Sequence, residues 1–485
     1  MEASYTVGHT NEDLSPFLQG PDRLAFRSPF PQHGGLSDFT AMLFSDLPQE
    51  ITQEILIAAV NVRGIKRATR LRYVSRSWNA AVMEAIFASR ILDQGNPKYL
   101  FWQRNLAYRV MDRPGRLSRP LRIIRKVAEH LVAYRSPSGK SFTDDALRCC
   151  VFEICNVPLE MNWSGRDRDK WFMDSDHSME SIDQDDKQFK QALLAAAAWT
   201  NEIGLVRDIL SSFQDCEYLI CQDGQGRQDF GLIFGEPVDL AAYRGHNEVV
   251  RLLMNAITKG SEENGLFWGK ILKNAAKGNH ISTVKLVLKP EYNCWDPSLV
   301  AGLQATASLE IFQTLLPLAK DFLQVEPQRK PNHYHNKFLP SQLQLAARSG
   351  NVPMMEYLFY LGVKIPAKWP KSRNPVLEAA KHGHKDALIC LLTKGFTLDQ
   401  DSFDAAVRYG NPDIVQVALN NAGKRHSFTQ ALLSAVGREN QSVTRMLLSQ
   451  ETTDLDNEVR TQAWWTAKKM GLESMARMLK QVRVI

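Results

Sequence analysis

A short helix–turn–helix pattern recurs along this chain and constrains its fold more than any other feature. The clearest copy is residues 237–254, PVDLAAYRGHNEVVRLLM. Ala241 and Ala242 are small enough to let a neighbouring helix approach, and Gly245 supplies the positive φ that ends the first helix. Val249 and Leu253 belong to the apolar stripe of a second helix. Two helices this short cannot bury a core alone, so the unit must stack on copies of itself.

The turn position of this unit recurs along the second half of the chain. Glycine fills most copies, and asparagine, the next-best residue for a left-handed conformation, fills two. Two further copies are recognisable only by their flanking apolar pattern. The nine turn positions are Asn201, Gly245, Asn279, Ala307, Gly350, Gly383, Gly410, Glu439 and Gly471. A two-helix repeat of about 33 residues predicts an all-α solenoid.

These copies resemble the ankyrin repeat. The pattern Ala-Ala-x-x-Gly-His that precedes Val-Val-Arg-Leu-Leu carries the resemblance, with the next-best matches at Gly350 and Gly383. It covers residues 188–485 and implies nine repeats. None of the copies has the family's full Thr-Pro-Leu-His opening, and several copies are degenerate.

Residues 41–92 follow another pattern, that of three short amphipathic helices. Ile51, Ile55 and Ala59 lie at i, i+4 and i+8, residues 61–64 predict a break, and Ser75 is expected to open the third helix. Such a module buries too little surface to be stable alone, and it usually completes its core against a partner.

The motifs Leu-Pro-x-Glu-Ile and Leu-Arg-x-Val-Ser-Arg-x-Trp in this segment resemble the F-box. The resemblance implies docking on a Skp-type adaptor and, through it, a cullin-based ubiquitin ligase. The implied adaptor-binding residues are Leu47, Pro48, Ile51, Ile55, Leu71, Val74 and Trp78. The middle helix is more polar than the usual leucine-rich version, which predicts weak adaptor affinity. The alternative is an ordinary helical hairpin packed on the rest of the chain.

The other segments differ in charge. Residues 1–40 are rich in Pro, Gly and Ser and predict a disordered arm. Residues 93–163 form a basic helical linker region, since residues 98–140 hold eleven bases and two acids. Residues 164–187 form an acidic linker, in which residues 174–186 carry six carboxylates and no Lys or Arg. The acidic run is a candidate partner for the basic segment. Nucleic acid binding is not expected, because charge alone is non-specific evidence.

No motif for catalysis, a metal or a cofactor has the required spacing. The odd number of cysteines, seven, in apolar helical contexts suits a reducing compartment. No segment approaches the roughly 20 apolar residues that cross a bilayer. The sequence therefore predicts a non-catalytic protein of the cytoplasm, the nucleus or both, without a membrane partner.

In the ankyrin family, the two residues before the turn glycine face the concave groove. Of eighteen such positions here, seven are Lys or Arg, three are aromatic and none is acidic. A basic residue at this place is also a habit of the repeat itself, which is the alternative explanation. The resulting candidate client-binding residues are Trp199, Tyr243, Arg244, Arg348, Lys381, Arg408 and Tyr409. They predict an acidic or phosphorylated client, because arginine grips carboxylate and phosphate in two-pronged contacts.

Two hypotheses about function follow. In the first, the chain is the substrate receptor of a Skp–cullin–F-box ubiquitin ligase, with the F-box on the adaptor and the repeats on a client. In the second, it is an ankyrin scaffold for protein–protein interaction whose F-box-like segment binds no adaptor.

Overall fold

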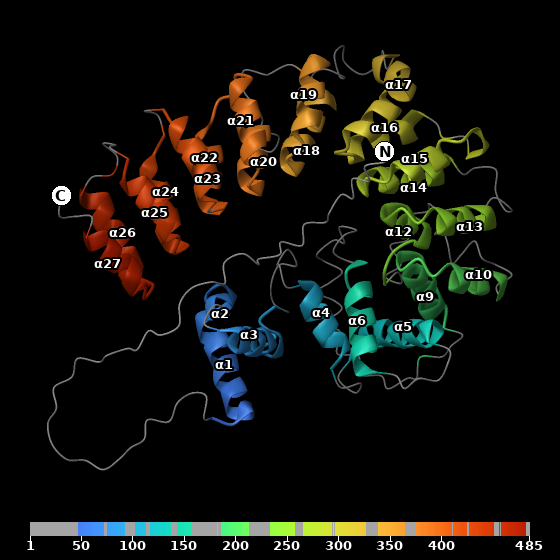
Figure 1. The fold of residues 1–485 in the computed structure, drawn as a ribbon, viewed down its shortest axis with the longest axis horizontal. Coiled ribbons are helices and arrows are strands. Elements are labelled where there is room, and N and C mark those ends of the chain that lie inside the picture. The colour runs from blue at the N-terminus through green and yellow to red at the C-terminus, as the bar shows by residue number, and fades with distance from the viewer. Residues whose placement is uncertain are drawn as a thin grey trace, which may run out of the picture. The chain divides into compact units, whose positions relative to one another are not determined.

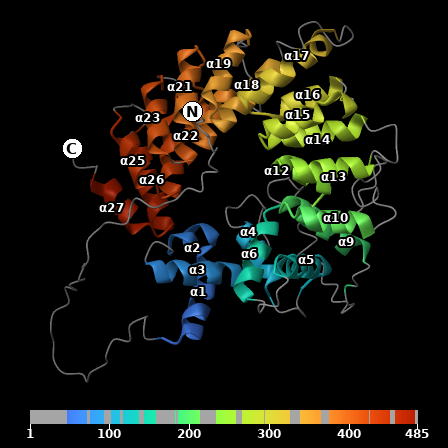
Figure 2. The same cartoon turned by 45° about the vertical axis from the view of Figure 1, so that its right-hand side comes forward.

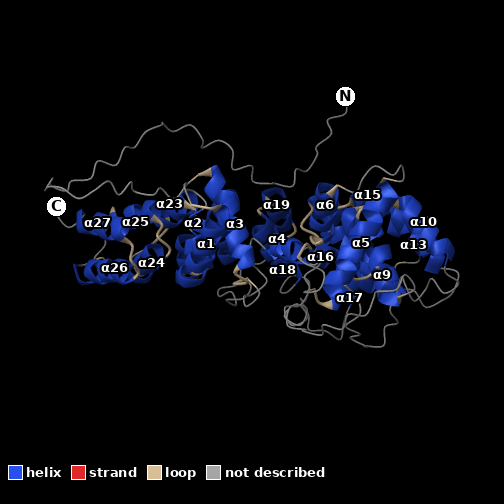
Figure 3. Cartoon of the chain, turned by 90° about the horizontal axis from the view of Figure 1, so that it is seen from below, coloured by secondary structure: helices blue, strands red, loops and turns tan. Residues whose placement is uncertain are grey.

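A computed structural model describes the chain in a series of helical segments. The described residues are 47–71, 75–92, 102–112, 117–136, 143–157, 182, 186–212, 233–257, 265–292, 294, 296–325, 338–363, 374–409, 411–423, 426–450, 455 and 457–481. The predicted disordered arm, residues 1–40, and Val74 lie outside them. Every regular element in these segments is a helix, as Figure 3 shows, which confirms the all-α prediction. None of these helices combines the length and apolarity needed to cross a membrane.

The chain divides into two compact units, residues 1–85 and 86–485. The first unit contains α1 (Gln49–Arg63), α2 (Ile65–Leu71) and most of α3 (Arg76–Ala88). Helix α1 packs against α2 and ends at Gly64, whose φ of 73° allows the chain to turn. Ser75 opens α3 as predicted, because its Oγ accepts a hydrogen bond of 3.1 Å from the Trp78 N–H. The helix break falls later than predicted, since α1 continues through Asn61 to Arg63.

After the end of α3, the described part of the second unit contains α4 (Trp102–Val110), α5 (Arg119–Arg135) and α6 (Asp144–Ile154), followed by nine helix pairs. The first helices of the pairs are α9 (Lys187–Trp199), α12 (Pro237–Arg244), α14 (Gly265–Lys277), α16 (Asp296–Ala305), α18 (Leu339–Ser349), α20 (Pro375–His382), α22 (Gln400–Tyr409), α24 (Phe428–Gly437) and α26 (Asn457–Lys469). The second helices are α10 (Ile203–Ser212), α13 (Asn247–Ile257), α15 (Ile281–Val287), α17 (Leu309–Val325), α19 (Val352–Tyr360), α21 (Lys385–Thr393), α23 (Pro412–Asn420), α25 (Gln441–Leu448) and α27 (Glu473–Gln481). A short 3-10 helix, η3 (Pro290–Tyr292), follows α15.

The helix pairs stack in chain order, as Figures 1 and 2 show. First helices pack on first helices and second helices on second helices, so one core runs through the unit from Leu106 to Leu479. The row of first helices is closely packed except between α16 and α18. At that junction Phe312 stacks on Phe338 and Tyr357, and the Asn351 side-chain amide donates a 2.8 Å hydrogen bond to the Ala307 carbonyl.

The turn inside most pairs uses a left-handed residue. Gly245 and Gly350 have φ of 75° and 70°, and Asn201, Asn279 and Glu439 adopt 61°, 63° and 59° at the equivalent place. Gly410 lies outside the described residues.

The turn at Ala307 is built differently, because Ala307 does not adopt a positive φ. Instead the Thr306 hydroxyl accepts a hydrogen bond of 3.0 Å from the Ser308 N–H. At this turn a side-chain hydrogen bond stabilises the reversal of the chain, whereas most other pairs use a residue with a left-handed backbone conformation.

Imidazole side chains that follow the turn tie one pair to the preceding pair. His246 Nε2 lies 3.0 Å from the Trp199 carbonyl oxygen, and His384 Nε2 lies 3.0 Å from that of Arg348. Since a carbonyl only accepts, each Nε2 carries the proton. The imidazole of His384 also lies against Gly350, where a Cβ would be 2.6 Å from its Nδ1. These contacts give both histidines a structural role.

Helices α4, α5 and α6 belong to the same core as the array. Helix α5 packs on α4, α6 and α9, and it buries an apolar stripe that includes Leu121, Ile124 and Leu131. Description of residues 93–163 as a linker is therefore incomplete: the described part caps the first helix pair.

Candidate interaction surfaces

Helix α1 carries an apolar stripe on its outer side in addition to the one that it buries. Leu56 and Val60 are buried, whereas Ile51 and Ile55 are 45% and 43% exposed. Val62 is 86% exposed and Ala58 is also exposed. Ile51, Ile55, Ala58 and Val62 lie at i, i+4, i+7 and i+11, the spacing of one helix face. We call these four residues the α1 stripe.

The other predicted adaptor-binding residues surround this helix in sequence. Pro48 is exposed and caps α1, where its missing N–H leaves no donor unsatisfied. Leu47, Leu71 and Trp78 are half-buried. Sequence reasoning missed Ala58 and Val62, although extending the i, i+4, i+7 spacing past Ile55 would have found both.

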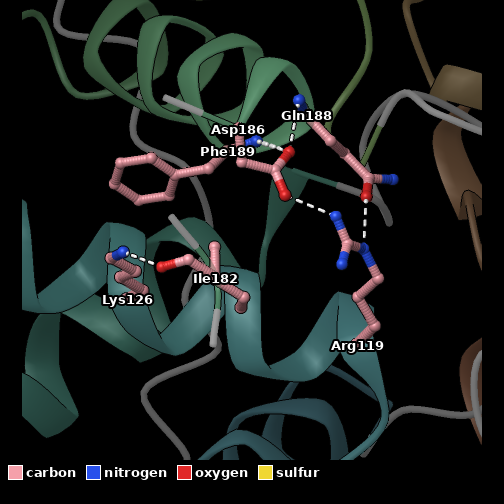
Figure 4. Close-up of polar contacts among 6 residues, drawn as sticks. All are labelled: Arg119, Lys126, Ile182, Asp186, Gln188 and Phe189. Carbon is pink, nitrogen blue, oxygen red and sulfur yellow. Dashed lines mark hydrogen bonds and ion pairs between the residues drawn. The ribbon is translucent and has the colours of Figure 1, made fainter. Parts of the chain in front are cut away.

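The basic segment is joined to the array by ion pairs. Arg119 on α5 contacts the Asp186 carboxylate, which also caps α9 by accepting the backbone N–H groups of Gln188 and Phe189. The Lys126 ammonium donates to the Ile182 carbonyl. Figure 4 shows these contacts. They support the sequence-based pairing of the acidic run with the basic segment, at the end of that run.

Two further arginines of α5 are engaged with acids. Arg135 lies 2.7 Å from Glu202 of the first helix pair and 3.2 Å from Glu153 of α6. Arg125 lies 3.2 Å from Glu129. Because carboxylates already neutralise Arg119, Arg125 and Arg135, this helix is a poor surface for phosphates.

Trp199 was predicted to face a client, and this prediction is wrong. Its side chain is only 1% exposed. The Tyr243 ring stacks on it with centroids 6.3 Å apart and planes 8° apart, and the Arg244 guanidinium carbon lies 4.7 Å from its centroid. The next pair's residues therefore cover Trp199, which supports Tyr243 and Arg244.

The remaining predicted client-binding residues reach the surface in two groups. Tyr243 and Arg244 are half-buried, and the Lys277 ammonium lies 5.6 Å from the Tyr243 ring centroid. We call Tyr243, Arg244 and Lys277 the upstream patch. Arg348, Lys381, Arg408 and Tyr409 are exposed, and Arg438 lies 5.8 Å from the Tyr409 ring centroid. These five residues form the downstream patch.

Several cations of the two patches are not engaged in ion pairs within the described part of the chain. Arg244, Arg348, Lys381 and Arg408 form no ion pair with any residue that the structure describes. This contrasts with α5, where arginines contact carboxylates.

Two histidines near the patches have pKa values lowered first by burial and then by the neighbouring arginines. Burial, and then the charge of Arg348, lower the pKa of His382, although Glu378 at 3.4 Å opposes this. Burial also lowers the pKa of His246, and Arg244 lowers it further against the raising effect of the Trp199 carbonyl.

The described residues contain no group of three or more His, Cys, Asp or Glu side chains placed to hold a metal ion. Burial raises the pKa of Cys150 and of Cys294 to about 11, so both thiols are protonated at neutral pH. They are therefore poor candidates for a nucleophile.

No family model matches the chain, and a search of curated proteins returns no match.

Proposed function

We propose that this chain is the substrate receptor of a Skp–cullin–F-box ubiquitin ligase. Residues 41–92 would be the F-box that docks on the adaptor, and residues 188–485 would be ankyrin repeats that hold a client. The chain would act by raising the client's concentration near the ubiquitin-loaded enzyme and would supply no chemistry of its own.

The observation that carries the proposal is the exposed α1 stripe. A helix in a small domain normally turns one apolar face inward and a polar face to water. Helix α1 has Leu56 and Val60 for the inner face and still exposes Ile51, Ile55 and Val62. A second apolar face on a marginally small module supports docking on a partner.

The experiment replaces Ile51 and Ile55 together with Ser and measures binding of the full chain to a purified Skp-type adaptor. Each Ile is nearly half exposed, so burying its exposed part is worth about 1 kcal/mol. Losing both should weaken adaptor binding by about 2 kcal/mol, or roughly 30-fold in Kd. Co-purification of adaptor and cullin from cells should fall in parallel.

Ile389→Ser is the matched control, because Ile389 on α21 is 39% exposed and lies outside the stripe. This control should bind the adaptor as the wild type does. Equal loss in both variants would point to misfolding, and full retention by Ile51→Ser/Ile55→Ser would refute the role of the stripe.

A second candidate is the ankyrin scaffold whose F-box-like segment binds no adaptor. The observation in its favour is α2, a helix of seven residues with the sequence IKRATRL. Among the side chains of α2 that the structure describes, that of Ala68 alone is buried. If the wild-type chain never retains the adaptor, this second candidate replaces the first.

A further inference from the structure

Three exposed cations lie at the same place in three consecutive helix pairs. Arg348, Lys381 and Arg408 each stand two residues before the turn position, at the ends of α18, α20 and α22. Helix α18 packs on α20, and α20 packs on α22, as Figure 1 shows. The three cations therefore form a row along one edge of closely packed helices, which we call the cation row.

The ends of these helices lie side by side. Burial lowers the pKa of His382 on α20, and the charge of Arg348 on α18 lowers it further, as expected for a guanidinium beside the end of the next helix. In the same way Arg438, which follows α24, lies 5.8 Å from the centroid of the Tyr409 ring at the end of α22. Side chains at equivalent positions of neighbouring pairs are thus within reach of a single ligand.

None of the three cations forms an ion pair with a described residue. The two acids that lie one turn earlier in α20 and α22 have other contacts. Glu378 lies 3.4 Å from His382, and Asp404 accepts a hydrogen bond of 2.9 Å from the Gln400 amide. The N–H groups of the cation row therefore suit an added carboxylate or phosphate.

The spacing of the row matches one conformation of an extended peptide. Packed helices lie about 8–10 Å apart, so the cations recur about every 9 Å. A polyproline II segment has about three residues per turn and rises about 3.1 Å per residue, so every third side chain returns to the same face after about 9 Å. In a β-strand the third residue along points to the opposite face.

The same row is a poor surface for single-stranded nucleic acid. Such binding stacks successive bases on aromatic rings. Tyr409 is the one Phe, Tyr or Trp at the two positions before the turn in the described ends of α18, α20 and α22, and Arg438 already lies over its ring.

We propose that the cation row binds one extended protein segment in the polyproline II conformation that carries an anionic side chain at every third residue. This inference rests on the client-binding role of the array in the proposed function, and it specifies what the client must contain. Successive anions lie on Arg348, Lys381 and Arg408. Helix α24 has Gly437 at the equivalent place, so the fourth position of the client has no cation to meet.

The test measures fluorescence anisotropy of labelled seven-residue peptides with the full chain at low salt. The probe is Glu-Pro-Pro-Glu-Pro-Pro-Glu, and its isomers are Pro-Pro-Glu-Glu-Glu-Pro-Pro and Glu-Pro-Glu-Pro-Glu-Pro-Pro. All three have equal charge and composition, and their prolines favour the same conformation. Each isomer turns only one Glu toward the row, so we expect the probe to bind at least about five-fold more tightly. A probe with phosphoserine in place of Glu, measured against its own isomers, shows whether carboxylate or phosphate is the preferred anion.

Charge-neutralising variants assign the site. Lys381→Gln should weaken binding of the probe about two- to three-fold and leave that of the isomers nearly unchanged. Lys394→Gln is the matched control, because Lys394 is also exposed and lies over the Phe359 ring, but at the end of a second helix, α21. It should leave every affinity unchanged, and thermal melting should show that both variants are folded.

A gain of binding gives a test that misfolding cannot imitate. Gly437 has no positive φ, and no atom lies within 4 Å of an added Cβ, so a longer side chain fits there. Gly437→Lys extends the row to α24. It should bind a ten-residue probe with a fourth Glu in the same spacing about two- to three-fold more tightly than the wild type does. Gly437→Ala should bind this probe as the wild type does.

Four outcomes would overturn the inference. Equal affinity for the probe and its isomers would mean one diffuse positive field, and equal effects of Lys394→Gln and Lys381→Gln would mean non-specific charge. Tighter binding of a helical peptide with three Glu spaced seven residues apart, about 10 Å per interval, would assign the row to a helix. Tighter binding of a single-stranded oligonucleotide of equal charge would assign it to nucleic acid.

Adaptor binding by the same preparations separates this inference from the proposed function. Failure of the probe with retention of the adaptor leaves the ligase proposal standing. Probe binding without adaptor retention supports the scaffold and the cation row together.

Discussion

Gly350 gives the sharpest test of how neighbouring helix pairs are joined. Its φ of 70° is left-handed, and a Cβ at this place would lie 2.6 Å from Nδ1 of His384. Gly350→Ala should therefore cost about 1–2 kcal/mol for the backbone conformation. Displacing the imidazole from the Arg348 carbonyl, 3.0 Å away, should cost about 1 kcal/mol more. We expect a total of about 2–3 kcal/mol.

Two other glycines separate these contributions. Gly362 also has a positive φ, of 80°, but no atom would lie within 4 Å of an added Cβ. Gly362→Ala should therefore cost only the backbone part, about 1–2 kcal/mol. Gly437 ends α24 without a positive φ and with open space around it, so Gly437→Ala should stabilise the chain by about 0.5–1 kcal/mol.

The measurement is native-state hydrogen exchange, read at the amides of α18 to α21, because a repeat array need not unfold in two states. A double variant, Gly350→Ala/His384→Ala, should cost less than the sum of its parts, since the clash disappears with the ring. If Gly350→Ala and Gly362→Ala cost the same, the imidazole contact contributes nothing and the reasoning fails.

Three further outcomes follow from single residues. Glu439→Gly should be more stable than Glu439→Ala by about 1 kcal/mol in urea unfolding, because both remove the carboxylate and only Gly relieves the φ of 59°. Burial, and then the charge of Glu236, raise the pKa of Asp239 to about 7. Its contribution to stability is thus complete below the unfolded pKa, falls as pH rises from there and is gone above about 7, a drop that Asp239→Asn should abolish between about pH 5.5 and 7.5. An equal drop in the variant would contradict this. Trp199→Ala should cost about 3–5 kcal/mol, against less than about 0.5 kcal/mol for Trp465→Ala, because these side chains are 1% and 63% exposed; similar melting temperatures for the two would count against the burial of Trp199.

Local patterns in the sequence were enough to predict the helix pairs and most of the turns inside them. Asn201 and Asn279 have the chemistry for a left-handed turn. Glu439 does not, yet it adopts one because the apolar stripes on both sides set its position. Ala307 shows the limit, since the Thr306 hydroxyl builds that turn by accepting a hydrogen bond from the Ser308 backbone N–H, and this bond is not visible in the periodicity.

The sequence did not reveal how neighbouring helix pairs, and α5, pack on one another. Trp199 has the register of a surface residue, but the next pair supplies Tyr243 and Arg244 to cover it. Residues 93–163 were predicted to be a linker from the charge of their arginines, although α5 also has a buried apolar stripe that contains Leu121, Ile124 and Leu131. That stripe has helical spacing and would have predicted a packed helix.

The contact of α5 with α9 decides where the chain can be divided for study. Phe189 of α9 is buried, with His130 packed edge-on against its ring and Lys126 over it. A fragment that starts at Lys187 would bare this ring together with the rest of the α9 face that α5 covers, and newly bared apolar surface promotes aggregation. The shortest well-behaved fragment should therefore start before Trp102. Any effect of removing the basic segment in cells must first be separated from the loss of this covering helix.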